Sequence, residues 1–500
     1  MELAGDVHYP TDLSAGPFPL VLFMHGNHSA CYRGNDTRYR WPCPAGWRPL
    51  PNYAGYDYIA ARLASHGFIV VSVSANGVNV LGNRVPDSGM RQRGEVLERH
   101  IDLWRDWSTV GGGPFGDTFL GSVDLSRIGT MGHSRGGEGV VWHRIVDEER
   151  EDPYGIDAVL ALAPVDFTRR KINDAAFAVI LPYCDGDVSD LQGIHFFDDS
   201  RYAVPGDPGP KHTVTAFGAN HNFFNTVWSP SSGFPGAFDD GEWSFCSERL
   251  SENQQRRMGR AYIVGFFRRY LAVEVTLDGM WTGAATPGGI APARTHVSYL
   301  APDAAARRLD LGRFLDEDDL ATSEAGGDLT ASGLAYYGLC ANTFRIPCVP
   351  GGASWRDIHR PGTAMGLVGW ERHDGILRFE IPDARRDASG FDAFQFRAVP
   401  NPGVAPIRHR FQDLAVALID EDGDVAAANA SEVGNEALAY PLTGGRRPVG
   451  HIILNQVRFP LTVFSGVDLT RLEAVELRFT RTRAGVLSIT DVAFSRGGAP

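Results

Sequence analysis

The stretch Arg127-Ile-Gly-Thr-Met-Gly-His-Ser-Arg-Gly-Gly137 decides the fold of this chain. It begins as a short apolar run typical of a buried parallel strand, and a helical pattern follows it. Between the two, Gly132-His-Ser-Arg-Gly136 has the spacing Gly-x-Ser-x-Gly. A serine on a sharp strand-to-helix turn needs such glycines, because neighbouring backbone approaches closely there. In a chain with 58 glycines the pattern also arises by chance as a plain turn, but its position between strand and helix predicts Ser134 as a nucleophile.

Short apolar runs alternate with amphipathic stretches on both sides of Ser134, as a parallel sheet with crossover helices requires. The predicted strands are 19–24, 68–73, 127–131, 156–162, 176–181 and 212–217. The predicted helices are 56–66, 91–107, one starting near 135, and 252–271. The first half of the chain is therefore predicted to be an α/β domain with a mostly parallel sheet.

The second half has a different pattern. A chain of 500 residues exceeds the roughly 250 to 300 residues that one hydrophobic core serves, so two domains are expected. The segment 283–294 is rich in Gly, Pro and Ala and is typical of a linker. Beyond it, period-two segments at 375–381, 393–397, 414–419 and 474–479 predict an antiparallel sandwich. We predict an α/β domain over 1–285 and a β-sandwich over 295–500.

A nucleophilic serine needs a base and an acid, which follow it in the order Ser, acid, His on a sheet of this kind. The acid is expected in Tyr183-Cys-Asp-Gly-Asp187, directly after a predicted strand. We favour Asp187, because Gly186 can turn the chain so that this carboxylate points back to the serine. Asp185 is the nearest alternative, followed by Asp190 and Asp166.

The base is expected in the loop after the last predicted strand, where Gly218-Ala-Asn-His221 places a histidine. His212 lies at the start of that strand and His195 follows the acid too soon, so both are better explained as surface or packing residues. His221 would remove the proton from Ser134, and the acid would hold the imidazole in the required tautomer. This mechanism needs no metal and no organic cofactor.

A third element is the segment His25-Gly-Asn-His28, which follows the strand 19–24. Hydrolases of this kind present a main-chain amide to the developing oxyanion at this position. The backbone N–H groups of Asn27 and Arg135 are therefore predicted to form the oxyanion hole, where each donor typically contributes about 3 to 4 kcal/mol. The side chains of Arg135 and Glu138, three apart on the predicted helix, are expected to pair.

At these residues the chain resembles the α/β-hydrolase superfamily, in particular its bacterial lipase, polyester hydrolase, platelet-activating-factor acetylhydrolase and chlorophyllase-like branches. The resemblance covers roughly residues 7 to 272, and Gly132–Gly137 looks like the chlorophyllase form of the serine turn. It implies hydrolysis of carboxylic esters, of a small molecule, a polymer or plant-wall material. The alternatives are an amidase or peptidase on the same fold, and a catalytically silent glycan-binding protein.

The insertion Ser29–Asn52 departs from those enzymes. It contains Tyr32, Tyr39, Trp41 and Trp47, and a disulfide between Cys31 and Cys43 could close it. It forms either an aromatic wall beside the acyl pocket or a surface loop that packs its own tryptophans. On the first reading, five residues contact substrate: His25, His28, His133, Trp41 and Trp47.

The six cysteines fall into three local pairs: Cys31 with Cys43, Cys184 with Cys246, and Cys340 with Cys348. An even, locally paired set favours disulfides and export, although buried thiols in a cytosolic enzyme are the alternative. The first residues carry no signal-peptide pattern, so either the protein is not exported or its signal is absent from this chain. On the evidence of the cysteines we expect a secreted protein. None of the spacings is the CxxC of a structural zinc site.

Net charge and hydropathy exclude several partners. A formal charge of -13 would repel nucleic acid and anionic membranes on average. No stretch approaches the ~18 to 20 apolar residues of a membrane helix. An ester substrate remains the expected partner.

The second domain resembles galactose-binding-like jelly rolls of the kind used as carbohydrate-binding modules. The resemblance rests on three segments: Phe459–Phe464, Val467–Leu472 and Leu487–Phe494. It implies either a glycan or polymer ligand or a purely structural role. Asp420–Asp424 lacks the distal Glu of an EF-hand and is interpreted as an acidic hairpin turn.

Overall fold

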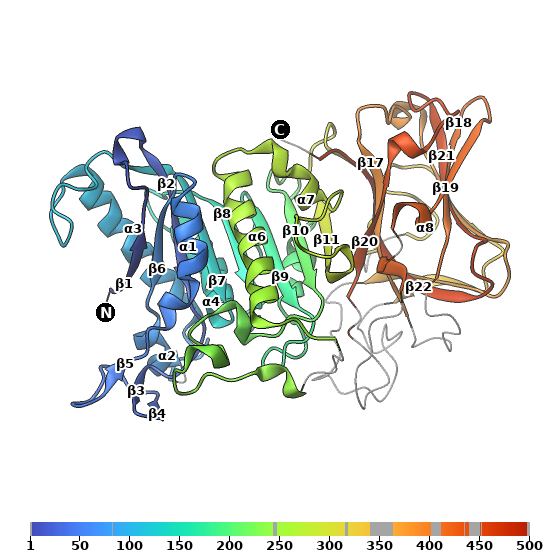
Figure 1. Ribbon diagram of the computed structural model, residues 1–500. Coiled ribbons are helices and arrows are strands. Elements are labelled where there is room, and N and C mark those ends of the chain that lie inside the picture. Colours follow the sequence, from blue (N-terminus) through green and yellow to red (C-terminus); the bar gives the residue numbers. More distant parts are fainter. Residues whose placement is uncertain are drawn as a thin grey trace. The chain divides into compact units, whose positions relative to one another are not determined.

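The computed structural model describes residues 3–82, 84–243, 248–315, 319–340, 364–401, 412–434, 436–439, 451 and 453–497. The chain divides into two compact units (Figure 1). The first comprises Met1–Ala203, Thr213–Asp278 and Pro287–Arg294, and the second Val204–His212, Gly279–Thr286 and Thr295–Pro500. The predicted linker 283–294 is thus shared between the two units.

The first unit is built on a mostly parallel sheet. Its strands follow in the order β1 (Gly5–His8), β6 (Ile69–Val73), β2 (Phe18–Met24), β7 (Val123–His133), β8 (Ile156–Leu162), β9 (Ala176–Pro182) and β10 (Lys211–Ala216). β1 pairs antiparallel with β6, whereas β6, β2, β7, β8 and β9 pair in parallel. β2, β6 and β9 are buried at every position, which explains their continuous apolar sequences.

Helices cover both faces of this sheet (Figure 1). α1 (Asp57–Ala64) and α6 (Glu252–Tyr270) lie on one face, and α3 (Met90–Thr109) and α4 (Arg135–Glu148) lie on the other. α6 begins with a capping box, in which Ser251 and Gln254 satisfy each other's backbone N–H groups. Two shorter helices of this unit are α2 (Asn76–Gly82) and α5 (Ile194–Ser200), whereas α7 (Asp278–Thr282) belongs to the second unit except for its first residue.

The insertion after β2 forms a small sheet of its own. Its strands β3 (Cys31–Arg33), β4 (Asp36–Arg38) and β5 (Arg48–Pro49) are antiparallel in the order β4-β3-β5. Cys31 and Cys43 form the predicted disulfide. Cys184 and Cys340 are disulfide-bonded as well, while their expected partners, Cys246 and Cys348, lie outside the described residues.

The second unit contains two antiparallel sheets. One has the order β14 (Tyr336–Cys340), β15 (Met365–Trp370), β22 (Gly485–Ser495), β17 (Ala393–Pro400), β20 (Asn455–Pro460), with β12 (Arg308–Gly312) also paired to β22. The other has the order β13 (Leu329–Ser332), β16 (Gly375–Glu380), β21 (Leu472–Phe479), β18 (Ala415–Asp420), β19 (Val425–Asn429). β11 (Thr295–Leu300) and α8 (Ala430–Val433) also belong to this unit. Aromatic side chains fill its core, and the rings of Trp370 and Phe479 lie 4.7 Å apart.

The predicted fold class is confirmed: an α/β unit with a mostly parallel sheet precedes a β domain. The sequence did not reveal β1, α2, α5 or the small β4-β3-β5 sheet, because these elements are short and partly polar. No helix within the described ranges is long and apolar enough to cross a membrane.

Candidate active site

Ser134 lies at the turn between β7 and α4, with φ 59° and ψ -125°. A non-glycine residue at positive φ is strained and persists only where the surroundings fix it. The close packing of neighbouring backbone supplies this constraint. A Cβ on Gly26 would overlap Cβ of Ser134 and lie 2.8 Å from the carbonyl oxygen of His133, and one on Gly136 would lie 2.8 Å from the carbonyl oxygen of His25. Glycine is therefore needed on both segments that enclose the serine.

Ser134 is buried, and its hydroxyl is unpaired among the described residues. The residue is 3% exposed, and its backbone N–H donates to the carbonyl of Leu162 at 2.9 Å. Throughout the described part of the chain, its hydroxyl has no hydrogen-bond partner. α4 begins at the next residue, so the positive end of the helix dipole faces this position.

His221 contacts two carboxylates through its two ring nitrogens. Nδ1 lies 2.8 Å from Oδ2 of Asp185, and Nε2 lies 3.5 Å from Oδ2 of Asp187. Oδ1 of Asp185 accepts hydrogen bonds from the backbone N–H groups of Asp187 and Val188, which fix this buried carboxylate. The side chain of Asp187 is 64% exposed. The carboxylate on Nδ1 is therefore that of Asp185, the alternative in the sequence, and not that of the favoured Asp187.

A third carboxylate, Asp240, completes the surroundings of His221. Asp240 is buried and accepts hydrogen bonds from the backbone N–H groups of His221, Asn222 and Gly186. Burial opposes a positive charge on His221, but Asp185, followed by Asp187 and Asp240, outweighs it and raises the pKa of His221 to about 10. Burial, followed by the charge of Asp185, raises the pKa of Asp240 to about 6.

His133 packs beneath the site instead of lining it. It is fully buried, and its ring centroid lies 4.7 Å from that of His221 and 5.0 Å from that of Trp228. Its Nδ1 lies 2.9 Å from the hydroxyl of Tyr56. Burial, followed by the charge of His221, holds the pKa of His133 well below its ordinary value. A neutral His133 thus supports the ring of His221.

His25 is also structural. Its Nε2 accepts a hydrogen bond from the backbone N–H of Ala75 at 2.8 Å, so Nδ1 carries the proton and donates to the carbonyl of Gly26 at 2.9 Å. Burial lowers the pKa of His25 to about 3, which keeps the ring neutral. The sequence predicted substrate contacts for His25 and His133, but the structure buries both away from solvent.

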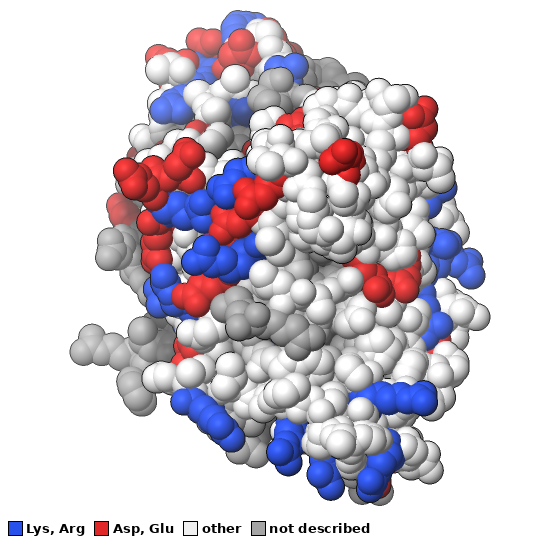
Figure 2. Space-filling view, turned by 90° about the vertical axis from the view of Figure 1, so that its left-hand side faces the viewer, with Lys and Arg blue, Asp and Glu red and all other residues white. Residues whose placement is uncertain are grey.

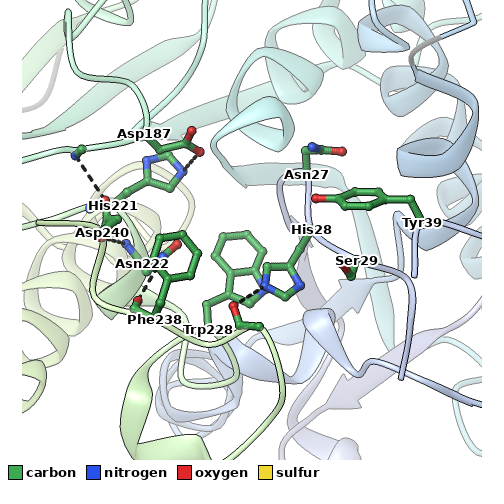
Figure 3. A pocket seen from close by; sticks show the side chains of 12 residues that line it. Asn27, His28, Ser29, Tyr39, Asp187, His221, Asn222, Trp228, Phe238 and Asp240 are labelled. Atoms are coloured by element: carbon green, nitrogen blue, oxygen red, sulfur yellow. Dashed lines mark hydrogen bonds and ion pairs between the residues drawn. The ribbon is translucent and has the colours of Figure 1, made fainter. Parts of the chain in front are cut away.

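A cavity of about 340 Å³ lies beside His221 (Figure 3). Its lining includes Asn27, His28, Tyr39, Asp187, His221, Trp228 and Phe238. His28 stacks on Trp228 with ring centroids 5.5 Å apart, and its Nε2 lies 3.2 Å from the carbonyl oxygen of Gly236. Figure 3 shows Tyr39 reaching into the cavity from the side of the insertion. His28 thus lines the cavity, and its predicted contact with substrate stays a prediction.

The two tryptophans of the insertion lie elsewhere. Trp47 is flanked by the guanidinium groups of Arg33 and Arg38, at 5.1 and 4.3 Å from its ring centroid. Trp41 packs near Gly77. Neither tryptophan is among the described residues that line the cavity beside His221. Tyr39 of the same insertion does line it, and Trp228 and Phe238 join it from the loop after His221, which no sequence pattern marked.

Asn27 follows Gly26, which packs on Ser134, and Arg135 is the first residue of α4. The role of their N–H groups as an oxyanion hole stays a prediction. The expected pair between Arg135 and Glu138 is not formed. Glu138 instead accepts hydrogen bonds from the backbone N–H groups of Phe167 and Thr168 and from the Thr168 hydroxyl. The guanidinium of Arg135 lies over the ring of Phe167, 5.8 Å from its centroid. Among the residues that the structure describes, no cluster of His, Cys, Asp and Glu is arranged to hold a metal ion.

The chain is similar in part to a curated enzyme. No family model matches the chain. A bis(hydroxyethyl) terephthalate hydrolase of Streptomyces coelicolor is 28% identical over 160 residues, which are 32% of this chain and 37% of that enzyme. The chain thus matches little more than a third of the length of this curated relative. The similarity is weak and partial, and it connects the chain to an enzyme that hydrolyses esters.

Proposed function

We propose that this protein is a serine hydrolase of carboxylic esters that acts through an acyl-enzyme. The observation that carries the proposal is the strained backbone of Ser134 at the start of α4, in the unit that also holds a buried carboxylate–imidazole pair, Asp185 and His221. A serine at positive φ between a strand and a helix, together with an imidazole held at Nδ1 by a buried carboxylate, is the combination that a serine hydrolase requires.

In this mechanism the proton of Ser134 passes to Nε2 of His221 while the serine oxygen attacks the ester carbonyl. The backbone N–H groups of Asn27 and Arg135 donate to the resulting oxyanion. The imidazolium then protonates the leaving alcohol, and water repeats the sequence on the acyl-enzyme. We assign to Asp185 the role of holding the neutral ring with its proton on Nδ1.

Asp187 has a different role in this proposal. Its carboxylate is close to Nε2, on the side where the serine proton must arrive. It stabilises the imidazolium that forms during the reaction and so makes the base stronger. Catalytic hydrogen bonds often form only when substrate binds. The unpaired hydroxyl of Ser134 is therefore compatible with this mechanism.

The cavity supports an ester with short to medium groups on either side of the carbonyl. Its volume of about 340 Å³ is at the small end of ligand sites, and Tyr39, Trp228 and Phe238 provide apolar contact area. The name of the similar Streptomyces coelicolor enzyme is that of a hydrolase of an aromatic diester. We include aromatic esters, polyesters and plant-wall esters in the proposed class, and we propose a secreted enzyme on the strength of its disulfides.

The test is a series of p-nitrophenyl esters of graded acyl length, together with labelling by a fluorophosphonate probe. Wild-type protein is expected to cleave the shorter esters and to bind the probe. Ser134→Ala should lose both, whereas Ser65→Ala, at an exposed helix end, should keep both. Equal hydrolysis by the Ser134→Ala variant would rule out the assignment, and absence of both activities in the wild type would favour a silent binding protein.

A further inference from the structure

The insertion 29–52 carries a charge opposite to that of the whole chain. It contains four arginines, Arg33, Arg38, Arg40 and Arg48, against one acidic residue, Asp36. The chain as a whole has a formal net charge of -13. We call the segment Cys31–Pro49, with its small sheet β4-β3-β5, the basic lobe.

The four guanidinium groups of the basic lobe have no carboxylate partners. All four arginines are exposed, and the described ranges show no ion pair for any of them. Elsewhere in the first unit some arginines are ion-paired, as Arg91 is with Glu149 and Arg268 with Glu274. Exposed arginines without an ion pair in the described chain also occur there, but Arg62, Arg257 and Arg260 do not lie in a segment as short as the basic lobe. Four cations without ion pairs in one short segment repel one another, so an anion that bound there would relieve this repulsion.

A disulfide and a small sheet hold the lobe together. The disulfide between Cys31 and Cys43 closes it. Register places Arg38 opposite Cys31 and Arg48 opposite Tyr32. In Figure 2 the lower end of the molecule, where these strands lie in Figure 1, carries blue side chains and very little red.

The same lobe forms part of the wall of the candidate active site. Tyr39, between Arg38 and Arg40 in the chain, is 52% exposed and lines the cavity beside His221. Tyr32 packs edge-on against Phe234, with ring centroids 5.8 Å apart, in the loop that also supplies Phe238 to the cavity. A polymer lying on the lobe would therefore have its neighbouring repeat units at the mouth of the cavity.

We propose that the basic lobe docks a carboxylate-bearing polymer whose ester groups are then presented to Ser134. Guanidinium groups bind carboxylates in bidentate fashion, and exposed aromatic rings add contact area for a polymer chain. The proposal rests on the esterase function above and names its substrate class. A carboxylate-bearing polymer is favoured over nucleic acid or an anionic membrane because the lobe adjoins the cavity that we propose cleaves esters.

Binding by the inactive Ser134→Ala protein tests the docking directly, with polygalacturonate as the anionic probe and hydroxyethylcellulose as the neutral probe. The lobe variant carries Arg33→Gln, Arg38→Gln, Arg40→Gln and Arg48→Gln. The control variant removes four other exposed arginines without ion pairs in the described chain: Arg62, Arg257, Arg260 and Arg385. Polygalacturonate affinity should fall about tenfold or more in the lobe variant only, and it should fall with added salt in the parent.

Catalysis supplies the second readout, with partially methyl-esterified polygalacturonate and neutral p-nitrophenyl acetate as substrates. In otherwise wild-type protein, the lobe variant should raise KM for the polymer about tenfold and leave p-nitrophenyl acetate hydrolysis within about twofold. Equal loss of polymer binding in both arginine variants would overturn the docking site. A lobe-dependent affinity for duplex DNA or phosphatidylserine vesicles without one for polygalacturonate would also overturn it. Failure of p-nitrophenyl acetate hydrolysis in the wild type would instead remove the esterase function.

Discussion

Nδ1 of His221 lies 2.8 Å from Oδ2 of Asp185, and both side chains are buried. The second oxygen of this carboxylate is held by two backbone N–H groups of the turn that follows. The carboxylate therefore has a fixed direction, and so does the imidazole. Asp187 is mostly exposed and contacts only the opposite nitrogen, so the two aspartates differ in what they do for His221.

Replacement of the two aspartates should separate these roles. Asp185→Asn removes the charge and favours the wrong tautomer of His221, so kcat for a p-nitrophenyl ester should fall roughly 10³ to 10⁴-fold. Asp187→Asn should cost about tenfold or less at alkaline pH, because the orienting contact remains. The measurement is steady-state kinetics, with thermal unfolding of both variants as a control. A larger loss for Asp187→Asn would make Asp187 the orienting acid.

The pH dependence of the reaction should report the carboxylates around His221. A general base acts in its neutral form. Burial lowers the pKa of His221, but the negative charges of Asp185, Asp187 and Asp240 outweigh burial and raise this pKa to about 10. The neutral fraction therefore grows as pH rises, and kcat/KM should increase across the neutral range and level off only under alkaline conditions. Asp187→Asn removes one anion, lowers this pKa, and should shift the profile to lower pH.

The control for this shift is Asp383→Asn, which changes the same charge at an exposed position in the second unit. It should leave the profile in place. A wild-type profile with a midpoint at or below pH 6.5, unchanged by Asp187→Asn, would contradict the raised pKa and the role of Asp187.

Gly26 should be as important as the serine turn itself. A Cβ at this position would overlap Cβ of Ser134, and neither backbone segment can retreat because both follow central strands. Gly26→Ala should therefore lower kcat/KM more than about a hundredfold by displacing the serine and the Asn27 N–H. Gly390→Ala, where an added Cβ meets nothing within 4 Å, should leave activity intact. Retained activity in a folded Gly26→Ala protein would show that the oxyanion segment lies elsewhere.

The parts of the site that the sequence could locate are those with a local signature. The turn at Ser134 needs glycines beside it, and those glycines are visible in the sequence. Strand positions follow from apolar runs, and His221 follows from its place after the last strand. These features depend on neighbours in the chain, which a single sequence contains.

The remaining features depend on contacts between distant segments. Asp185 and Asp187 are chemically identical, and only the path of the turn decides which one meets Nδ1 of His221. That path is set partly by Asp240, whose carboxylate accepts the N–H groups of Gly186 and His221 from a loop with no motif. In the same way, the fold of the insertion decides that Tyr39, and neither Trp41 nor Trp47, lines the cavity.

Glu138 lies in the first turn of α4, the helix that follows Ser134, and its ionisation can be tested. Burial raises its pKa to about 7 against the opposing hydrogen bonds from Phe167 and Thr168. Because the pKa of Glu138 is higher in the folded protein than the value of 4.5 in the unfolded chain, its protonation adds to the free energy of unfolding. This contribution is fully present below pH 4.5 and is lost as pH rises through 7. Glu138→Gln removes this titration. The variant should therefore gain about 3 kcal/mol relative to wild type between pH 4 and pH 8 in denaturant unfolding. Glu148→Gln, at an exposed site on the same helix, should show no comparable trend, and a pH-independent difference for Glu138→Gln would mean that Glu138 remains ionised throughout.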